Sequence, residues 1–279
     1  MDIYYINLIA RFLLGLVLAA LAAVAAYQVH SLTPGGAIAA FVLGTVIFGL
    51  GGLPWAVLLL AFFLTSSTLS QVLRSRKQYL DEKFSKDSKR DAAQVFANGG
   101  VAGICTILHL IFPASALPWI AFAGSLAAVN ADTWATELGV LSHSAPRLIT
   151  SWKPVERGTS GAISLSGTLS ALAGSALIAA LALIFWQYSN HLPVVSAFVR
   201  LVIISLAGLV GSLVDSLLGA TVQAIYYCPS CNKTTERHPL HTCGTQTTPV
   251  RGWSWMNNDW VNTFCAMAGA LFALLIALL

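Results

Sequence analysis

The sequence is built from long apolar blocks, and the length of these blocks limits its fold more than any other feature. Several blocks approach or exceed the roughly 20 residues that a helix needs to cross the hydrocarbon core of a bilayer. Charged residues make up only 9% of the chain, whereas a soluble globular protein carries about 25%. This composition argues strongly against a soluble fold and predicts membrane-spanning helices.

We predict one all-α transmembrane domain over residues 1–279, a polytopic helix bundle of eight spans. Two segments interrupt the apolar pattern. Residues 74–92 form a basic loop, and residues 226–252 form a small zinc-ribbon-like insert rich in Cys and His. The predicted spans are 7–29, 33–51, 53–70, 93–112, 117–142, 162–186, 197–225 and 261–279.

The distribution of Lys and Arg predicts the orientation of the bundle. Eight spans place 13 of the 15 basic residues in three loops on one side, and only Arg11 and Arg200 remain for the other. Basic loops stay in the cytosol. We therefore expect an integral protein of the cytoplasmic membrane with both termini facing outward. The 74–92 loop either serves this orientation alone or also contacts anionic lipid.

Four carboxylates lie within or at the ends of the predicted spans: Asp132, Glu137, Asp215 and Asp259. A charge near the bilayer centre costs about 2.5–3.5 kcal/mol on insertion scales, so each needs a reason. A lone carboxylate at a helix end can simply lie among the lipid headgroups. Four carboxylates expected at the same cytosolic face favour an active site, and we assign catalytic roles to Asp132, Asp215 and Glu137.

Carboxylate and amide oxygens suit Mg²⁺, which proteins usually hold with one or two carboxylates together with substrate phosphates. Asn258 and Asn262 are four residues apart at the start of the last span, so one helix face presents both amides. The predicted magnesium ligands are Asp132, Asp215, Asp259, Asn258 and Asn262.

The loop after the fifth span combines cations with the Gly/Ser/Thr-rich segment GTSG. Such a segment ahead of a helix presents backbone N–H groups to an anion. No G-x-x-x-x-G-K-[ST] pattern is present, and GTSG alone is more often a plain helix cap. Beside the carboxylates we interpret it as a phosphate cradle, with Lys153 as a catalytic cation. The predicted nucleotide- or phosphate-binding residues are Asn98, Arg147, Arg157, Gly158, Thr159, Ser160 and Gly161.

The segment CPSC…HPLHTCG has the ligand types and the tight turn of a structural zinc site. The loop is predicted to be cytosolic, where disulfides are disfavoured. We assign zinc to Cys228, Cys231, Cys243 and His241, and His238 remains the alternative fourth ligand. The opposing interpretation is a turn with reduced thiols and no metal.

Six motifs in the same order resemble a family of integral membrane proteins that includes the plant phytyl-phosphate kinases of tocopherol synthesis. They are RDAAQVFANGG, NADTWATELG, PRLITSWKPVERGTSGAIS, GLVGSLVDSLLGATVQ, CPSC…HTCGT and MNNDWVN. More distantly, DTWATELG is similar to a motif of CTP-dependent polyprenol kinases, matched at Asp132, Ala135 and Gly139. His143 replaces the Gly with which that motif continues, so ATP and CTP both remain candidate donors. The resemblance implies phosphoryl transfer to an isoprenyl monophosphate, giving the diphosphate.

We therefore expect a Mg²⁺-dependent phosphotransferase, with a nucleoside triphosphate as donor and a membrane-embedded isoprenyl (phytyl or polyprenyl) phosphate as acceptor. Its partners are the acceptor, the nucleotide and the lipid bilayer, with no nucleic acid. A phosphate acceptor is ionised near neutral pH, whereas a lipid alcohol would need a general base such as Asp132. A lipid-alcohol kinase is the second hypothesis. A transporter is the third, although transporter sites lie near the bilayer midplane rather than at one face.

Overall fold

The computed structural model describes residues 3–73, 89–142, 144–185 and 197–279. Most of the predicted 74–92 loop lies outside the described residues, and so does position 143. Within the described residues the chain forms eight α-helices and a short π-helix, η1 (Ile47–Gly51), which continues α2. The α-helices are α1 (Ile3–Gln28), α2 (Pro34–Val46), α3 (Leu53–Val72), α5 (Ala92–Ile111), α6 (Leu117–Gly139), α7 (Leu165–Ile184), α8 (Ala197–Thr221) and α9 (Asn258–Ala277).

These helices confirm the predicted all-α bundle. Seven helical segments in the described part of the chain are long and apolar enough to cross a membrane. The remaining helix is α6, whose last ten residues include Asn130, Asp132 and Glu137. Because these polar side chains lower its hydropathy, α6 depends on the surrounding helices to shield it from lipid.

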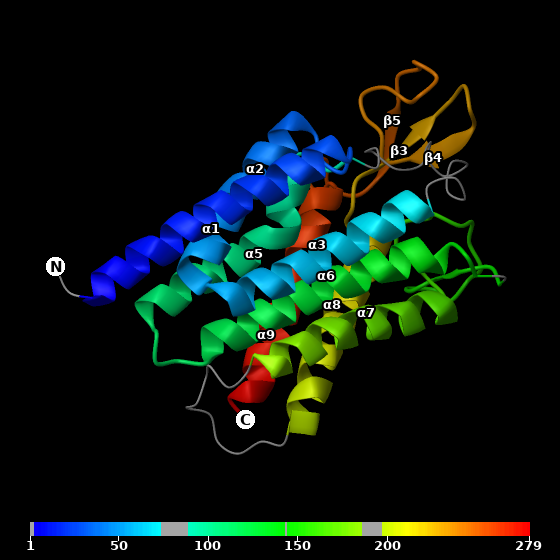
Figure 1. Ribbon diagram of the computed structural model, residues 1–279. Coiled ribbons are helices and arrows are strands. Elements are labelled where there is room, and N and C mark those ends of the chain that lie inside the picture. The colour runs from blue at the N-terminus through cyan, green and yellow to red at the C-terminus, as the bar shows by residue number, and fades with distance from the viewer. Residues whose placement is uncertain (1–2, 74–88, 143, 186–196) are drawn as a thin grey trace.

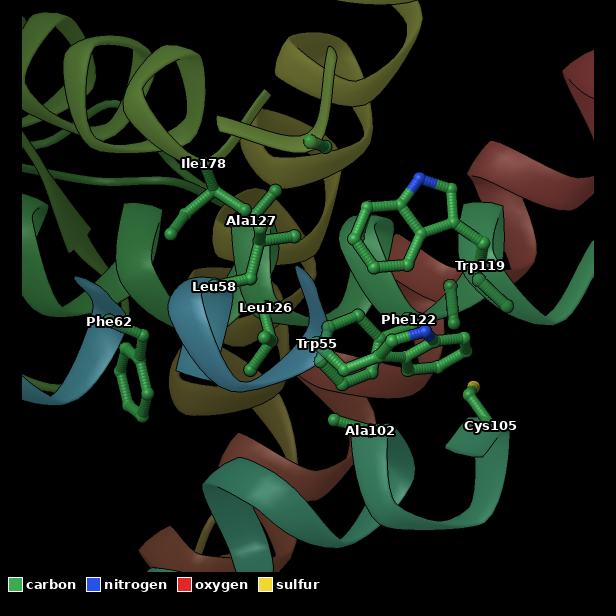
Figure 2. Packing of buried hydrophobic residues seen from close by; sticks show 14 of the residues in the cluster. Trp55, Leu58, Phe62, Ala102, Cys105, Trp119, Phe122, Leu126, Ala127 and Ile178 are labelled. Carbon is green, nitrogen blue, oxygen red and sulfur yellow. The ribbon is translucent and has the colours of Figure 1, made fainter. Parts of the chain in front are cut away.

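Helix α6 runs through the middle of the bundle (Figure 1), where it packs against α3, α5, α7, α8 and α9. Every residue from Pro118 to Ala131 is buried. At its N-terminal end Phe122 packs against Trp55 of α3, with ring centroids 4.5 Å apart, and stacks with Trp119 (Figure 2). Aromatic pairs of this kind add to the free energy gained by burial. The first half of α6 is therefore an apolar core, and its polar groups lie in the second half.

Small residues allow the helices around α6 to approach closely. A Cβ atom on Gly211 of α8 would collide with Ala128 of α6. Gly124 of α6 and Gly269 of α9 face each other in the same way, since a Cβ on either would meet the other's carbonyl oxygen. Close backbone approach of this kind is typical of helix contacts in lipid. It brings the polar half of α6 next to α8 and α9.

Five short strands lie outside the bundle in the described residues. Strands β1 (Arg147–Leu148) and β2 (Ala162–Ile163) pair antiparallel. Strands β3 (Ile225–Cys228), β4 (Lys233–Thr235) and β5 (Thr248–Arg251) form a sheet in the order β4-β3-β5. Figure 1 shows this sheet at one end of the bundle, away from the start of α1 and the end of α9.

The segment 226–252, which we call the Cys/His insert, is attached to the end of α8. The Arg251 guanidinium donates hydrogen bonds to the carbonyl oxygens of Gly219 and Ala220, at the helix C-terminus where a cation is favoured. Burial lowers the pKa of Arg251. The exposed side chains of Trp253 and Trp255 stack beside the exposed Trp260. Tryptophan is enriched at membrane–water interfaces, so these rings indicate an interface at this end.

Candidate functional site

A polar cavity of about 380 Å³ lies at the end of the bundle that carries the strands. Its walls come from α3, α5, α6, α7, α8 and α9, from the loop that joins β1 to β2, and from the Cys/His insert. The residues that line it therefore come from most of the length of the chain. Of the residues predicted from sequence, the cavity brings together Asn98, Asp132, Glu137, Arg157, Gly158, Thr159, Ser160, Gly161, Asp215, Asn258 and Asn262.

The acidic centre of the cavity consists of Asp132 on α6 and Asp215 on α8. The Ser212 hydroxyl donates a long hydrogen bond of 3.5 Å to Asp132 Oδ1. Both carboxylates line the same space. Asp215 Oδ2 is buried with no hydrogen-bond partner among the described residues. Asp132 and Asp215 are both half-buried, and two such carboxylates that line one space are costly without a cation. Their hard oxygens fit Mg²⁺.

Glu137 lies one and a half turns further along α6. The Ser70 hydroxyl of α3 donates a 2.6 Å hydrogen bond to Glu137 Oε1. Arg90, directly before α5, also lines the cavity and interacts electrostatically with Glu137. Arg90 was predicted as a basic residue of the loop and as the first residue of the motif RDAAQVFANGG, but not as a site residue. The next residue, Asp91, caps α5 and so fixes where Arg90 lies.

The partly buried Arg90 guanidinium is held in a defined position. It donates a 2.8 Å hydrogen bond to Ser66 Oγ and lies over the rings of Phe62 and Phe63, 5.4 and 5.5 Å from their centroids. Burial lowers the pKa of Arg90 to about 10, with partial compensation from Glu137. Arg90 therefore stays protonated near neutral pH and supplies a permanent cation to the cavity wall.

The Gly158–Gly161 loop packs against the C-terminal end of α8. Gly161 has φ +83°, and a Cβ there would collide with Ala220, so only glycine fits. The N–H and hydroxyl groups of Thr159 both donate to the Glu156 carbonyl oxygen, at 3.2 and 2.7 Å. The loop does not lead straight into a helix. Strand β2 follows it, and α7 begins after Ser164, whose hydroxyl accepts from the Gly167 N–H.

Glu236 is a further carboxylate of the cavity that was not predicted from the sequence. It follows β4 in the Cys/His insert. Glu236 Oε1 accepts hydrogen bonds from the Ser160 hydroxyl at 2.8 Å and from Gln223 Nε2 at 2.9 Å. The insert is thus joined directly to the Gly158–Gly161 loop. Nothing in the local sequence around Glu236 indicated this contact.

Three predicted site residues do not line the cavity. The exposed Arg147 donates a 2.8 Å hydrogen bond to the Trp152 carbonyl oxygen, and Lys153 is exposed. Asp259 lines a neighbouring hollow beneath the Cys/His insert, together with Arg237 and His238. The cations that do line the cavity are Arg90 and Arg157 among the described residues.

The Cys/His insert contains a cluster that could hold a metal ion. One ligand atom from each of Cys228, Cys231, His241 and Cys243 lies within 4.8 Å of the others. The Cys228 and Cys243 sulfurs are 3.6 Å apart, and His241 Nδ1 is 3.3 Å from Cys243 Sγ. A tetrahedral zinc ion with bonds of about 2.3 Å would separate two sulfurs by about 3.8 Å. The geometry therefore fits zinc.

The structure favours His241 over His238 as the fourth ligand. The ring of His238 stacks on Tyr226, with centroids 4.3 Å apart, and its Nδ1 lies 3.3 Å from Thr247 Oγ1.

The thiols of the cluster differ in pKa. Hydrogen bonds with Thr245 and His241 lower the pKa of the Cys243 thiol to about 5, whereas hydrogen bonding to Cys243 raises the pKa of the Cys231 thiol to about 11. Cys243 is therefore the thiol poised to be a thiolate, the form that binds metals.

A family model described as integral membrane protein DUF92 matches residues 17–270. Protein PGR of Arabidopsis thaliana is 36% identical over 239 residues, which cover 80% of this chain and 83% of that protein. An uncharacterized membrane protein of Methanocaldococcus jannaschii is 32% identical, over 66% of this chain and 72% of its own. Protein VTE6, chloroplastic, of Arabidopsis thaliana is 25% identical, over 88% of this chain and 66% of its own. No solved structure matches.

Proposed function

We propose that this chain, which belongs to the DUF92 family of integral membrane proteins, is a Mg²⁺-dependent kinase of an isoprenyl monophosphate. The observation that carries the proposal is the composition of the polar cavity. Several carboxylates, two arginines and a glycine-rich loop line one space at the end of a membrane bundle. Phosphoryl transfer needs mainly positioning and charge neutralisation, and these groups are of the types that supply both.

In this proposal the carboxylates and amides hold the metal. Asp132 and Asp215 would be ligands, and Asn258 and Asn262 from α9 would complete the site directly or through water. Bound Mg²⁺ would neutralise the phosphate oxygens of the nucleotide. Glu236 holds the Ser160 hydroxyl, so it orients the Gly158–Gly161 loop toward the same space.

The reaction requires no strong base. An oxygen of the ionised isoprenyl monophosphate attacks the γ-phosphorus, the bond from that phosphorus to the β–γ bridging oxygen breaks, and the nucleoside diphosphate leaves with its electron pair. Arg90 and Arg157 would neutralise the charge on the reacting phosphates. Because the nucleophile is already an anion, Asp132 and Glu137 remain available for metal binding and for orientation.

The packing of the opposite half of the bundle favours an enzyme over a transporter. The first half of α6 is buried without interruption, and Trp55, Trp119 and Phe122 pack together there (Figure 2). A transporter would need access from both ends, whereas the polar cavity lies at one end. The basic residues of the loops place that end in the cytosol in this proposal.

A nucleotide panel tests the proposal directly. Purified protein in lipid nanodiscs receives ATP or CTP with Mg²⁺ and one acceptor: phytyl, geranylgeranyl or undecaprenyl phosphate, or phytol. We expect a diphosphate product from at least one phosphate and none from phytol. Product from the alcohol instead would favour a lipid-alcohol kinase. If wild type consumes no nucleotide with any acceptor, the kinase proposal fails and transport becomes the better hypothesis.

The orientation is tested separately. One cysteine is added before α1 or after α9, and a membrane-impermeant thiol reagent is applied to intact cells. Both variants keep the native cysteines, so the chain without an added cysteine is the background control. Both terminal positions should react from outside. Reaction only after lysis would contradict the proposed orientation.

A further inference from the structure

A second, apolar cleft lies beside the polar cavity. It is bounded by α1, α2, α3 and α5, and its volume is about 70 Å³. Three residues at its end, Arg90, Gln94 and Asn98, also line the polar cavity. The two spaces therefore meet at the N-terminal end of α5, where an apolar wall changes to a polar one.

The wall of the apolar cleft consists largely of small and apolar side chains. Helix α1 contributes Ala19, Ala22, Ala23 and Ala26, which share one face of the helix. The other faces of α1 expose large apolar residues such as Leu14, Val17 and Leu21. In a bilayer those faces contact lipid chains. The cleft is therefore separated from the hydrocarbon by one helix and is suited to receive a chain from it.

Arg90 is positioned by backbone contacts that do not depend on a ligand. Its N–H donates to the Ser31 carbonyl oxygen, and its own carbonyl oxygen accepts from the Thr33 N–H, both at 3.0 Å. Its guanidinium has one described hydrogen bond, to Ser66. A guanidinium carries five N–H donors, so it can bind a phosphate while keeping that bond.

We propose that the apolar cleft binds the hydrocarbon chain of a linear isoprenyl monophosphate and that Arg90 binds its phosphate where the cleft meets the polar cavity. This inference rests on the proposed function and places the acceptor in the molecule. A narrow space fits one chain better than the two chains of a diacyl lipid. Alanine and glycine leave room for the methyl branches of an isoprenoid.

The chain of the acceptor has one competing location. Leu209 and Leu213 of α8 and Ala171 of α7 are among the apolar residues that line the polar cavity itself. A chain bound there would leave the bundle between α7 and α8 rather than beside α1. Arg90 lines both spaces, so its substitution alone cannot distinguish the two locations. Mapping the residues that contact the hydrocarbon chain of the acceptor can.

The test uses a phytyl monophosphate with a photoreactive diazirine in its chain. Protein in nanodiscs is labelled without nucleotide, and labelled peptides are mapped by mass spectrometry with unlabelled phytyl phosphate as competitor. We expect labels on α1, α2, α3 or α5. Labels confined to α7 and α8 overturn the inference.

Variants on α1 provide the matched comparison. Ala22→Phe fills the apolar cleft and should lower competable labelling about tenfold, the order expected when a hydrophobic site is blocked. Ala25→Phe, at an exposed position of the same helix, should leave it unchanged. If Ala22→Phe melts below wild type, Ala40→Phe on α2 gives the same test. If either folded variant, Ala22→Phe or Ala40→Phe, is labelled as strongly as wild type, the apolar cleft does not bind the hydrocarbon chain.

Charge variants test the phosphate contact. Arg90→Gln should weaken labelling at least tenfold, because a charge-assisted contact is lost, and Arg90→Lys should retain most of it. Unchanged labelling in Arg90→Gln would remove the phosphate contact from the inference. Wild type that is labelled along α1 but transfers no phosphoryl group would refute the proposed function and leave this site standing.

Discussion

The polar cavity and the Cys/His insert are both suited to metal ions, yet they are built in opposite ways. Cys228 and Cys243, the outermost ligands of the insert, are 15 residues apart in the sequence. Asp132 and Ser212, which meet in the cavity, are 80 residues apart and lie on different helices. A local ligand set needs only a turn to form, whereas the cavity exists only once the bundle has packed.

The two regions also differ in ligand chemistry. The insert offers sulfur and imidazole nitrogen in a closed group of four, which is typical of structural zinc. The cavity offers carboxylate and amide oxygens with space left for a ligand, which suits Mg²⁺ with substrate phosphates. The comparison therefore separates a region expected to support stability from one expected to support chemistry. Glu236 joins them.

The largest expected effect is the loss of the cavity's charge. Asp132→Asn and Asp215→Asn keep the size of the side chain but remove the charge that would hold a divalent ion. Turnover should fall at least roughly 100-fold, as when one preorganised electrostatic group is removed. The melting temperature in detergent should not fall, because a neutral group is less costly to bury. Wild-type kinase activity in both variants would refute the site.

Phe122→Ala in the apolar half of α6 serves as the matched control. It opens a cavity in a packed core, so it should lower the melting temperature. Activity per folded molecule should be unchanged because Phe122 lies outside the polar cavity. Equal losses of activity in this variant and in Asp132→Asn would show that the assay reports folding rather than chemistry.

The next largest effect concerns metal in the insert. Purified protein should contain about one zinc per chain, as expected for a single four-ligand site. Cys231→Ser should lose that zinc and melt at a lower temperature, and His241→Ala should behave likewise, whereas His238→Ala should keep the metal. Metal analysis and thermal melting measure this. A metal-free protein as stable and active as wild type would mean that the segment is only a turn.

An intermediate effect is expected at the connection between the two regions. Glu236→Gln weakens the hydrogen bond from Ser160 without touching any ligand of the Cys/His cluster. Turnover should fall about tenfold, because a charge-assisted hydrogen bond that orients the loop becomes a neutral one. Ser160→Ala should give a similar loss. The zinc content of both variants should equal that of wild type. Glu236→Gln with unchanged turnover would mean that the insert does not position the loop.

The smallest effect is expected at Lys153. Its catalytic role, which the sequence predicts, stays a prediction, but its exposed side chain does not line the cavity. Solvent screens an exposed charge, so Lys153→Ala should lower turnover by about twofold at most. Arg157→Ala should lower it more, because Arg157 lines the cavity. A larger loss in Lys153→Ala would indicate that the loop closes over the nucleotide.

The sequence by itself determined the helices of this protein and its Cys/His cluster. Apolar length is a local property. Each predicted span begins and ends within four residues of the observed helix when α2 and η1 are counted together. Cys-x-x-Cys followed by His-x-Cys is also local, so the cluster could be identified before any packing was known. The sequence favoured His241 over His238, and the structure agrees, because His241 lies in the cluster whereas the ring of His238 stacks on Tyr226.

Only the tertiary structure decided which polar residues share the cavity. Asp132 and Asp215 were predicted to meet and do line one space, whereas Asp259 lies in a neighbouring hollow. Glu236 joined the site without a signal of its own, and Arg90 had only its place at the start of the motif RDAAQVFANGG. The physical reason is that these positions depend on how closely helices approach, and that distance is set by contacts such as Gly211 against Ala128. Such contacts join residues far apart in the chain, so no local pattern predicts them.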